Sequence, residues 1–143
     1  MLYELLDGTT ATPTAYRREA GVTQIFTKQI TSAANAGDVT IATLTDGACL
    51  IKSIVLNSNG VTTADLTSAA IEGGAAKVVE FISAVSAAKA NIDVADEQVN
   101  FTGIIRLPAT STIVMDLQGT DATAVDLQVT IEYVAVTDGA YLV

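Results

Sequence analysis

The sequence predicts an all-β protein: a single antiparallel β-sandwich, jelly-roll-like, of about eight strands, with an extended N-terminal arm and a short helical insert. Three observations predict this class. Polar and apolar residues alternate along several segments, which is the period of a strand with one buried face. Turn-forming Gly, Asp and Asn separate these segments at fairly even intervals. The 143 residues, 50% of them hydrophobic, fit one domain. A chain of this size buries roughly 70% of its surface on folding.

The clearest strand is the stretch Ala124–Val136. Its odd-numbered residues from Val125 to Ala135 are apolar or aromatic, and its even-numbered residues from Asp126 to Glu132 are polar. Successive side chains of a strand point to opposite faces, so this pattern predicts a central strand of the sandwich with one buried face. We expect it to pair with Ser111–Gln118 through a hairpin at residues 119–123.

The other strands precede it in the chain. We expect Thr23–Ile30, Asp38–Leu44 and Ala48–Asn57 as the first three, with a turn at residues 45–47. A turn at residues 57–60 then leads to Thr62–Glu72. Gly73 and Gly74 predict the next turn, because glycine adopts positive φ without a Cβ clash.

The second half of the domain contains the one helix-like segment. Val78–Ile82 is a short strand, and the Ala-rich segment Ser83–Ala90 predicts a helical turn with Ser83 as its N-cap. Val99–Leu107 and Ser111–Gln118 again alternate between apolar and polar residues. Together with Ala124–Val136 these segments give the eight strands of a jelly roll or a comparable sandwich.

The chain divides into an N-terminal arm (residues 1–21), a β-sandwich domain (22–136) and a C-terminal tail (137–143). The arm has no sustained period, so it is either a frayed terminus or a segment that becomes ordered against a partner. The apolar end of the tail is expected to pack on the domain or on a neighbour. On the second interpretation of the arm, its contact residues are Leu2, Tyr3, Leu5, Leu6, Tyr16 and Arg17.

Charge excludes some classes of partner. Lys and Arg number 7 against 16 Asp and Glu, which gives a formal charge of -9 and a pI near 4.1. Such a surface repels phosphate backbones and anionic lipid, so neither nucleic acid nor a membrane surface is an expected partner. No apolar run approaches the ~20 residues that span a bilayer, and the N-terminus lacks a secretory pattern. We therefore expect a soluble protein made in the cytoplasm.

The residues needed for common catalytic sites are missing. The chain has no His, which excludes Ser-His-Asp and Cys-His arrangements and His-containing zinc sites. Cys49 lies in an apolar run and is expected to be buried. Asp93, Asp96 and Glu97 lack the spacing of an EF-hand and indicate a solvated acidic turn. We therefore expect no catalytic residues, no cofactor and no metal site.

Three segments carry a resemblance to a known family: Gly37–Leu56, Ile104–Leu117 and the Thr-rich strand Ala124–Val136. In these segments the chain resembles the small β-sandwich decoration (cement) proteins of tailed-bacteriophage capsids. The resemblance implies a non-enzymatic virion protein on the capsid exterior, assembled in the host cytoplasm, which binds the major capsid protein and stabilises the shell. It also implies a homo-oligomer, with a trimer favoured and a dimer possible.

Two other functions stay open from the sequence. Jelly rolls also carry sugar sites on their loops, so the alternative is a carbohydrate-binding or adhesion module such as a tail-fibre head domain. The absence of Trp and the 5% aromatic content argue against that alternative. The third hypothesis is a small hydrolase with paired carboxylates drawn from residues such as Asp116, Asp121 and Asp126, which would have to lie about 5 to 10 Å apart.

Overall fold

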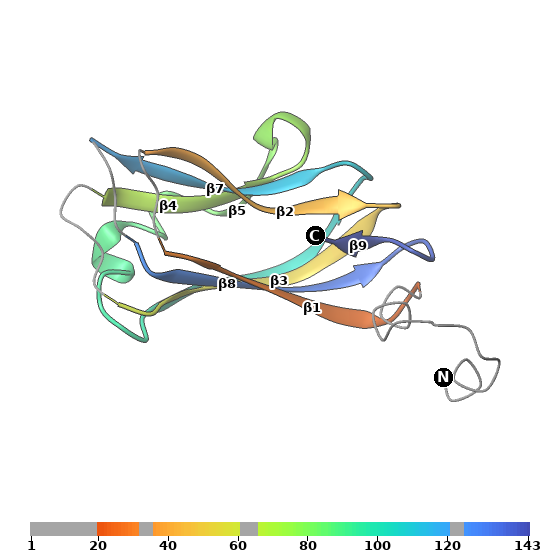
Figure 1. The fold of residues 1–143 in the computed structure, drawn as a ribbon, viewed down its shortest axis with the longest axis horizontal. Helices are drawn as coiled ribbons and strands as arrows, with labels where there is room; N and C mark the ends of the chain where they lie inside the picture. Colours follow the sequence, from red (N-terminus) through yellow and green to blue (C-terminus); the bar gives the residue numbers. More distant parts are fainter. Residues whose placement is uncertain (1–19, 32–35, 61–65, 121–124) are drawn as a thin grey trace.

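A computed structural model gives the fold and describes residues 20–31, 36–60, 66–120 and 125–143 (Figure 1). The described residues form nine strands in a four-stranded and a five-stranded antiparallel sheet, which face each other as a sandwich (Figure 1). The strands are β1 (Thr23–Ile30), β2 (Gly37–Thr45), β3 (Cys49–Ser58), β4 (Leu66–Gly73), β5 (Val79–Ile82), β6 (Gln98–Leu107), β7 (Thr112–Gly119), β8 (Leu127–Ala135) and β9 (Tyr141–Leu142). Two short 3-10 helices are η2 (Ala75–Lys77) and η3 (Lys89–Asn91).

The strand pairing identifies the sandwich as a jelly roll. β1 pairs with β8, β2 with β7, β3 with β6 and β4 with β5, all antiparallel. This is the pairing of one long antiparallel ribbon that has been wound up. The additional pairs β3–β8 and β4–β7 join the turns of the ribbon into the sheets β1-β8-β3-β6 and β5-β4-β7-β2-β9. The predicted jelly-roll-like sandwich is confirmed, with β9 added at the edge of β2.

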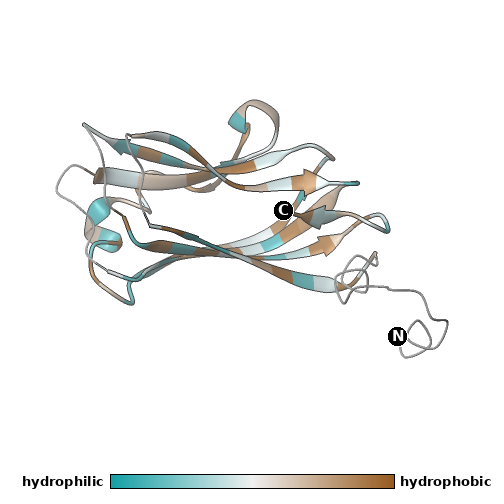
Figure 2. Ribbon diagram, viewed as in Figure 1, coloured by the Kyte–Doolittle hydropathy of each residue, from teal (hydrophilic) through white to brown (hydrophobic). Residues whose placement is uncertain are grey.

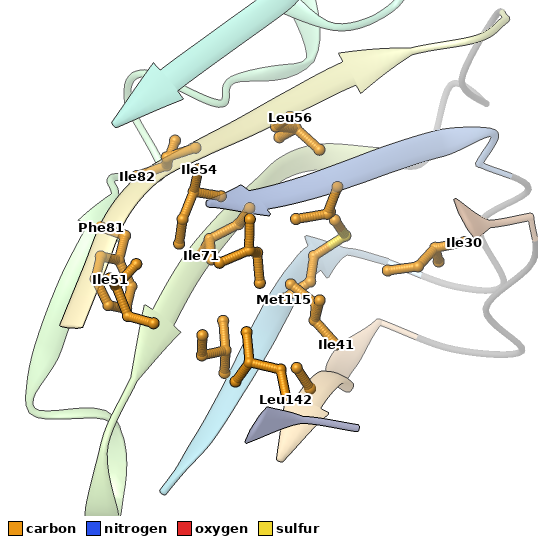
Figure 3. Close-up of a cluster of buried hydrophobic side chains, with 14 of the residues drawn as sticks. Ile30, Ile41, Ile51, Ile54, Leu56, Ile71, Phe81, Ile82, Met115 and Leu142 are labelled. Atoms are coloured by element: carbon orange, nitrogen blue, oxygen red, sulfur yellow. The ribbon is translucent and has the colours of Figure 1, made fainter. Parts of the chain in front are cut away.

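The core lies between the two sheets and follows the predicted alternation. In β8, Leu127, Val129 and Ile131 are fully buried, and the polar residues between them are half-exposed. Figure 2 shows the same alternation of hydrophobic and hydrophilic residues along the other strands. Large aliphatic side chains from both sheets meet in the middle, among them Ile54 and Met115 (Figure 3). Each such buried side chain stabilises the fold by roughly 1.5–3 kcal/mol, so the core is the main source of stability.

The predicted hairpin between the last two long strands is wrong. β7 lies in the five-stranded sheet between β4 and β2, and β8 lies in the four-stranded sheet between β1 and β3. The connection that follows Gly119 therefore crosses from one sheet to the other, and part of it, residues 121–124, lies outside the described residues. Two consecutive strands with the same alternation can pair side by side or pack across a core, and the jelly roll uses the second arrangement. The prediction that the last strand is central is correct, because β8 is paired on both sides.

The other predicted elements differ from the structure mainly at their ends. The strand predicted to begin at Thr62 is described from Leu66, since residues 61–65 lie outside the described residues. The predicted helical turn begins at Ser83, whose Oγ accepts a hydrogen bond from the Ser86 N–H at 3.1 Å. The Ala87 N–H donates to the Ser83 carbonyl at 2.9 Å, and η3 completes the insert. Ser83 thus caps the turn as the sequence indicates.

Two glycines make room for an aromatic pair where β5 meets β6. Phe81 and Phe101 pack edge to face with ring centroids 5.1 Å apart. A Cβ on Gly73 would lie 2.6 Å from Phe81 Cε2, and one on Gly103 would lie 2.8 Å from Phe101 Cζ. Gly73 therefore serves close packing at the end of β4, whereas Gly74 forms the predicted turn with φ of 87°.

A buried polar network ties the C-terminal strand to the four-stranded sheet. The hydroxyl of Tyr133 in β8 donates a hydrogen bond to Gln24 Oε1 at 3.1 Å and accepts one from the Leu142 N–H at 3.3 Å. β9 also pairs with the end of β2 through Leu44. Leu142 is buried in the core, so this apolar tail residue packs on its own domain.

Candidate interaction surfaces

The residues predicted to contact a partner all lie outside the described part of the chain. They are Leu2, Tyr3, Leu5, Leu6, Tyr16 and Arg17. The described chain begins at Ala20, whose N–H donates a hydrogen bond to Asp138 Oδ1 at 2.9 Å. The N–H of Gly21, a residue with φ of 80°, donates to the Ala135 carbonyl at 3.0 Å. The chain thus enters the sandwich where β1 begins and β8 ends.

The outer face of the four-stranded sheet is close to electrically neutral, and we call it the neutral face. It consists of the side chains of β1, β8, β3 and β6 that alternate with the buried core residues. Its charged members are Lys52, Arg106 and Glu132, two positive charges and one negative, in a chain of formal charge -9. The members of the neutral face are Thr23, Ile25, Thr27, Gln29, Gln128, Thr130, Glu132, Val134, Leu50, Lys52, Ser53, Val55, Asn57, Gln98, Asn100, Thr102, Ile104 and Arg106.

One end of the neutral face is aliphatic. Leu50 and Val134 are direct cross-strand partners at its centre, and both remain half-exposed. Ile25 on β1 is 68% exposed and Ile104 on β6 is 73% exposed. The register places Ile25 diagonally to Val134 and Ile104 diagonally to Leu50, with Glu132 and Arg106 beside them. The aliphatic patch, as we name it, consists of Ile25, Leu50, Ile104 and Val134. It lies at the end of the sheet where the described chain begins.

The other end of the neutral face carries one amide side chain on each strand. Strand register places Gln29 opposite Gln128, Gln128 opposite Asn57, and Asn57 opposite Gln98. Side-chain amides both donate and accept hydrogen bonds, so this amide row can bind a polar surface of either kind. Asp126 lies beside it and accepts hydrogen bonds from Gln29 Nε2 at 2.8 Å and from Asn59 Nδ2 at 3.2 Å. These two hydrogen bonds lower the pKa of the Asp126 carboxyl.

A β-bulge in β3 positions the ion pair of the neutral face. Among the described residues of this face it is the one ion pair. Ile51 opposes Tyr133 and Ser53 opposes Glu132, so Lys52 is an extra residue in β3 and points outward beside Ser53. Its Nζ lies 3.1 Å from Glu132 Oε1. The pair joins β3 to β8 and neutralises both charges at the middle of the face.

The outer face of the five-stranded sheet is acidic. Lys77, at the end of η2, contacts carboxylates from three strands: Asp38 of β2, Glu72 of β4 at 3.5 Å and Asp116 of β7 at 4.0 Å. The hydrogen bond to Asp38 and the charges of the three carboxylates raise the pKa of Lys77. Glu80 of β5 adds a further negative charge beside Glu72, so the carboxylates on this face outnumber its lysine.

Carboxylates and the single cysteine are the side chains of the described ranges that the sequence singles out for metal binding or chemistry. A group of three or more metal-ligating His, Cys, Asp or Glu residues is absent from these ranges. Asp93, Asp96 and Glu97 form a tight turn, in which Glu97 Oε2 accepts a hydrogen bond from the Val94 N–H at 3.0 Å. Cys49 is fully buried, and burial raises its pKa to about 11, so its thiol is protonated at neutral pH. The described residues contain no helix with the length and hydrophobicity of a membrane span.

The neutral face was visible in the sequence only as the polar side of each strand. The alternation identifies outward positions strand by strand, but the rows that join Leu50 to Val134, or Gln29 to Gln128, depend on the order of strands in the sheet. The cluster around Lys77 was missed for the same reason, because its carboxylates come from three separate strands. Lys77 and Ala76 also have φ of 56° and 55°, a conformation that no local sequence signal predicts.

No family model matches the sequence, and no curated protein matches it. The structure is similar to a chain of the capsid asymmetric unit of cyanophage Pam1, with a TM-score of 0.54 at 18% identity over 89% of this chain and 99% of that chain. It is also similar to a chain of the acidic stable capsid structure of the Helicobacter pylori bacteriophage KHP30, with a TM-score of 0.50 at 11% identity over 87% and 94%. The expected resemblance to phage capsid proteins is confirmed at the level of the fold.

Proposed function

We propose that this chain is a structural virion protein that binds the outer surface of a phage capsid and stabilises the shell. The observation that carries the proposal is the shared fold: chains from two phage capsids match this jelly roll over nearly their whole length. A protein of this size that is almost entirely jelly roll offers a rigid body with broad outer faces. The role requires binding and stiffness, and it requires no catalytic group.

The described surface supports a binding role. The neutral face presents uncharged polar and aliphatic side chains from four strands, a composition suited to broad contacts with another protein. Its side chains stand on a hydrogen-bonded four-stranded sheet over a packed core, so little backbone conformational entropy is lost on contact. The acidic face favours a basic protein surface and disfavours nucleic acid and anionic lipid.

The arm completes the proposal. In this model of function, residues 1–21 reach from the β-sandwich domain (22–136) to the major capsid protein or to a sister subunit. The proposed contact residues are those named above: Leu2, Tyr3, Leu5, Leu6, Tyr16 and Arg17. The protein would act as a homo-oligomer on the capsid exterior, and the resemblance favours a trimer and allows a dimer.

Co-sedimentation tests the proposal. Purified protein is mixed with capsids of the parent phage assembled without it, and the capsids are pelleted. We expect saturable binding, with the bound protein in a fixed ratio to the major capsid protein. Protein that stays in the supernatant at every concentration would reject the proposed function.

Deletion of residues 1–21 tests the arm separately. The truncated protein is expected to keep a cooperative thermal melt, because its core residues all lie in the sandwich, and to bind capsids more weakly. The matched control is a full-length chain in which the six contact residues are intact and Val85, an exposed residue of the helical insert, is replaced by Ser. Equal binding by the truncated and full-length proteins would rule out a role for the arm.

A further inference from the structure

The neutral face has the properties of a surface that binds a second copy of the same chain. We propose that two copies pack their β1-β8-β3-β6 sheets face to face about a two-fold axis, burying the aliphatic patch. This inference concerns self-association and does not rest on the proposed capsid role. It is carried by three observations on the face: its exposed apolar side chains, its charge, and the chemistry of its hydrogen-bonding groups.

The aliphatic patch is too continuous to be scattered surface apolar residues. Single exposed apolar residues are common on soluble proteins, but contiguous patches mark interaction sites. Here Val134 and Leu50 are direct cross-strand partners. Ile25 lies diagonally to Val134 and Ile104 diagonally to Leu50, while Glu132 and Arg106 are the direct partners of Ile25 and Leu50. Other exposed valines, such as Val78 beside η2, are outside this sheet.

Charge selects a second copy as the occupant. Two like copies of a chain with formal charge -9 repel each other over most of their surface. If two five-stranded sheets faced each other, the excess carboxylates of one copy would lie against those of the other and repel them. These carboxylates are Asp38, Glu72, Glu80 and Asp116 around Lys77. The neutral face lacks this barrier, because Lys52 is paired with Glu132 and Arg106 is the remaining charge.

The polar groups of the neutral face can form hydrogen bonds with the same groups on a second copy. The amide row and the threonines Thr27 and Thr130 contain groups that are at once donors and acceptors, so the same surface can supply both sides of each hydrogen bond. A two-fold axis parallel to the strands brings patch onto patch and amide row onto amide row. An isologous contact of this kind closes at two subunits.

The area of the neutral face determines how tightly we expect the two copies to bind. Four strands spaced ~4.8 Å apart, each with about eight residues at ~3.3 Å, give a face of roughly 500 Å². Two such faces bury roughly 1,000 Å², which is at the lower limit of specific interfaces. The dimer is therefore expected to dissociate on dilution.

Analytical ultracentrifugation of the full chain over a wide concentration range, with charge substitutions, tests the proposal. We expect a monomer–dimer equilibrium, and we expect Ile104→Glu to weaken it by roughly tenfold to hundredfold, as for the loss of an apolar interface contact and the burial of a charge in its place. Val78→Glu is the matched control, since Val78 is 77% exposed and lies outside the face. It should leave the equilibrium unchanged. Circular dichroism melts of both variants show whether the fold is intact.

Cross-linking locates the contact directly. Cys49 is buried, so a cysteine introduced by Thr130→Cys at the middle of the neutral face would be the reactive thiol. A short bis-maleimide should link two such chains, and it should not link chains carrying Glu80→Cys on the acidic face. The proposal is overturned by a chain that stays monomeric, by a trimer, or by a dimer that the Ile104 substitution leaves intact. A monomer whose Ile104→Glu variant loses capsid binding would assign the face to the shell instead.

Discussion

The replacement of Ile131 by Asp tests whether the buried side of β8 is assigned correctly. Ile131 is fully buried in the middle of β8, opposite Phe26 on one neighbouring strand and Ile54 on the other. Loss of a buried Ile side chain costs about 2–5 kcal/mol. A carboxyl without partners at this depth would have its pKa raised by about 3–5 pH units, so it would be largely protonated at pH 7. Protonating it at pH 7 from its ordinary pKa of about 3.9 costs about 4 kcal/mol, at about 1.4 kcal/mol per pH unit.

Together these two costs reach roughly 6–9 kcal/mol, which is comparable with the whole stability of a domain, about 5–15 kcal/mol. We therefore expect Ile131→Asp to lack a cooperative melt by circular dichroism at neutral pH. Ile131→Val removes one methylene and should lower the free energy of unfolding by only about 1 kcal/mol. Gln128→Asp, on the outward side of the same strand, should change it by less than about 1 kcal/mol. An Ile131→Asp variant with an unchanged melt would refute the assignment of the buried face.

Three further predictions follow from the packing and the pKa shifts. Gly73→Ala places a Cβ 2.6 Å from the ring of Phe81 and should lower the urea midpoint by the equivalent of about 1–3 kcal/mol. Gly60→Ala, where the nearest atom is 3.9 Å away, should shift it far less, and equal shifts would contradict the packing argument. Burial raises the pKa of Cys49 to about 11, so maleimide should modify its thiol only after unfolding; rapid labelling of the native protein would show the thiol exposed. The two hydrogen bonds to Asp126 lower its pKa. The stability that they contribute is present above its unfolded pKa of about 3.9 and is lost as the pH falls through the folded value. The free-energy difference between wild type and Asp126→Asn should therefore shrink in acid, and a difference that is constant with pH would contradict the assignment.

Local periodicity was enough to predict most of the fold. The alternation in β8 identified its buried residues correctly, and the same pattern located β6 and β7 to within a residue or two. Strand-like runs between turn residues located β1, β2 and β3 equally well. These predictions succeed because the side chains of a strand alternate whatever the strand pairs with. The prediction that Ser83 caps the helical turn succeeded for a similar reason, because Ser83 contacts residues only three and four positions further along the chain.

Strand order could not be predicted in the same way. β7 and β8 have the same pattern and follow each other in the chain, yet they belong to opposite sheets, because the pairing in a jelly roll depends on contacts between segments far apart in sequence. The functional surfaces depend on that order. The aliphatic patch draws residues from four strands, and the cluster around Lys77 draws carboxylates from three.

The proposed contact residues of the arm follow from their composition alone. Leu2, Tyr3 and Tyr16 are apolar or aromatic side chains in a segment without a strand or helix period. Such side chains gain stability only where a partner buries them, so their roles stay predictions that the truncated protein tests.

Electron cryo-microscopy of capsids with and without bound protein tests the central claim most directly. We predict additional density on the outer surface of the shell, at positions that repeat with the capsid symmetry and with the dimensions of one jelly roll per subunit. The density should be absent from capsids that lack the protein. Unchanged capsid density at saturating protein, or density confined to the inside of the shell, would contradict the account.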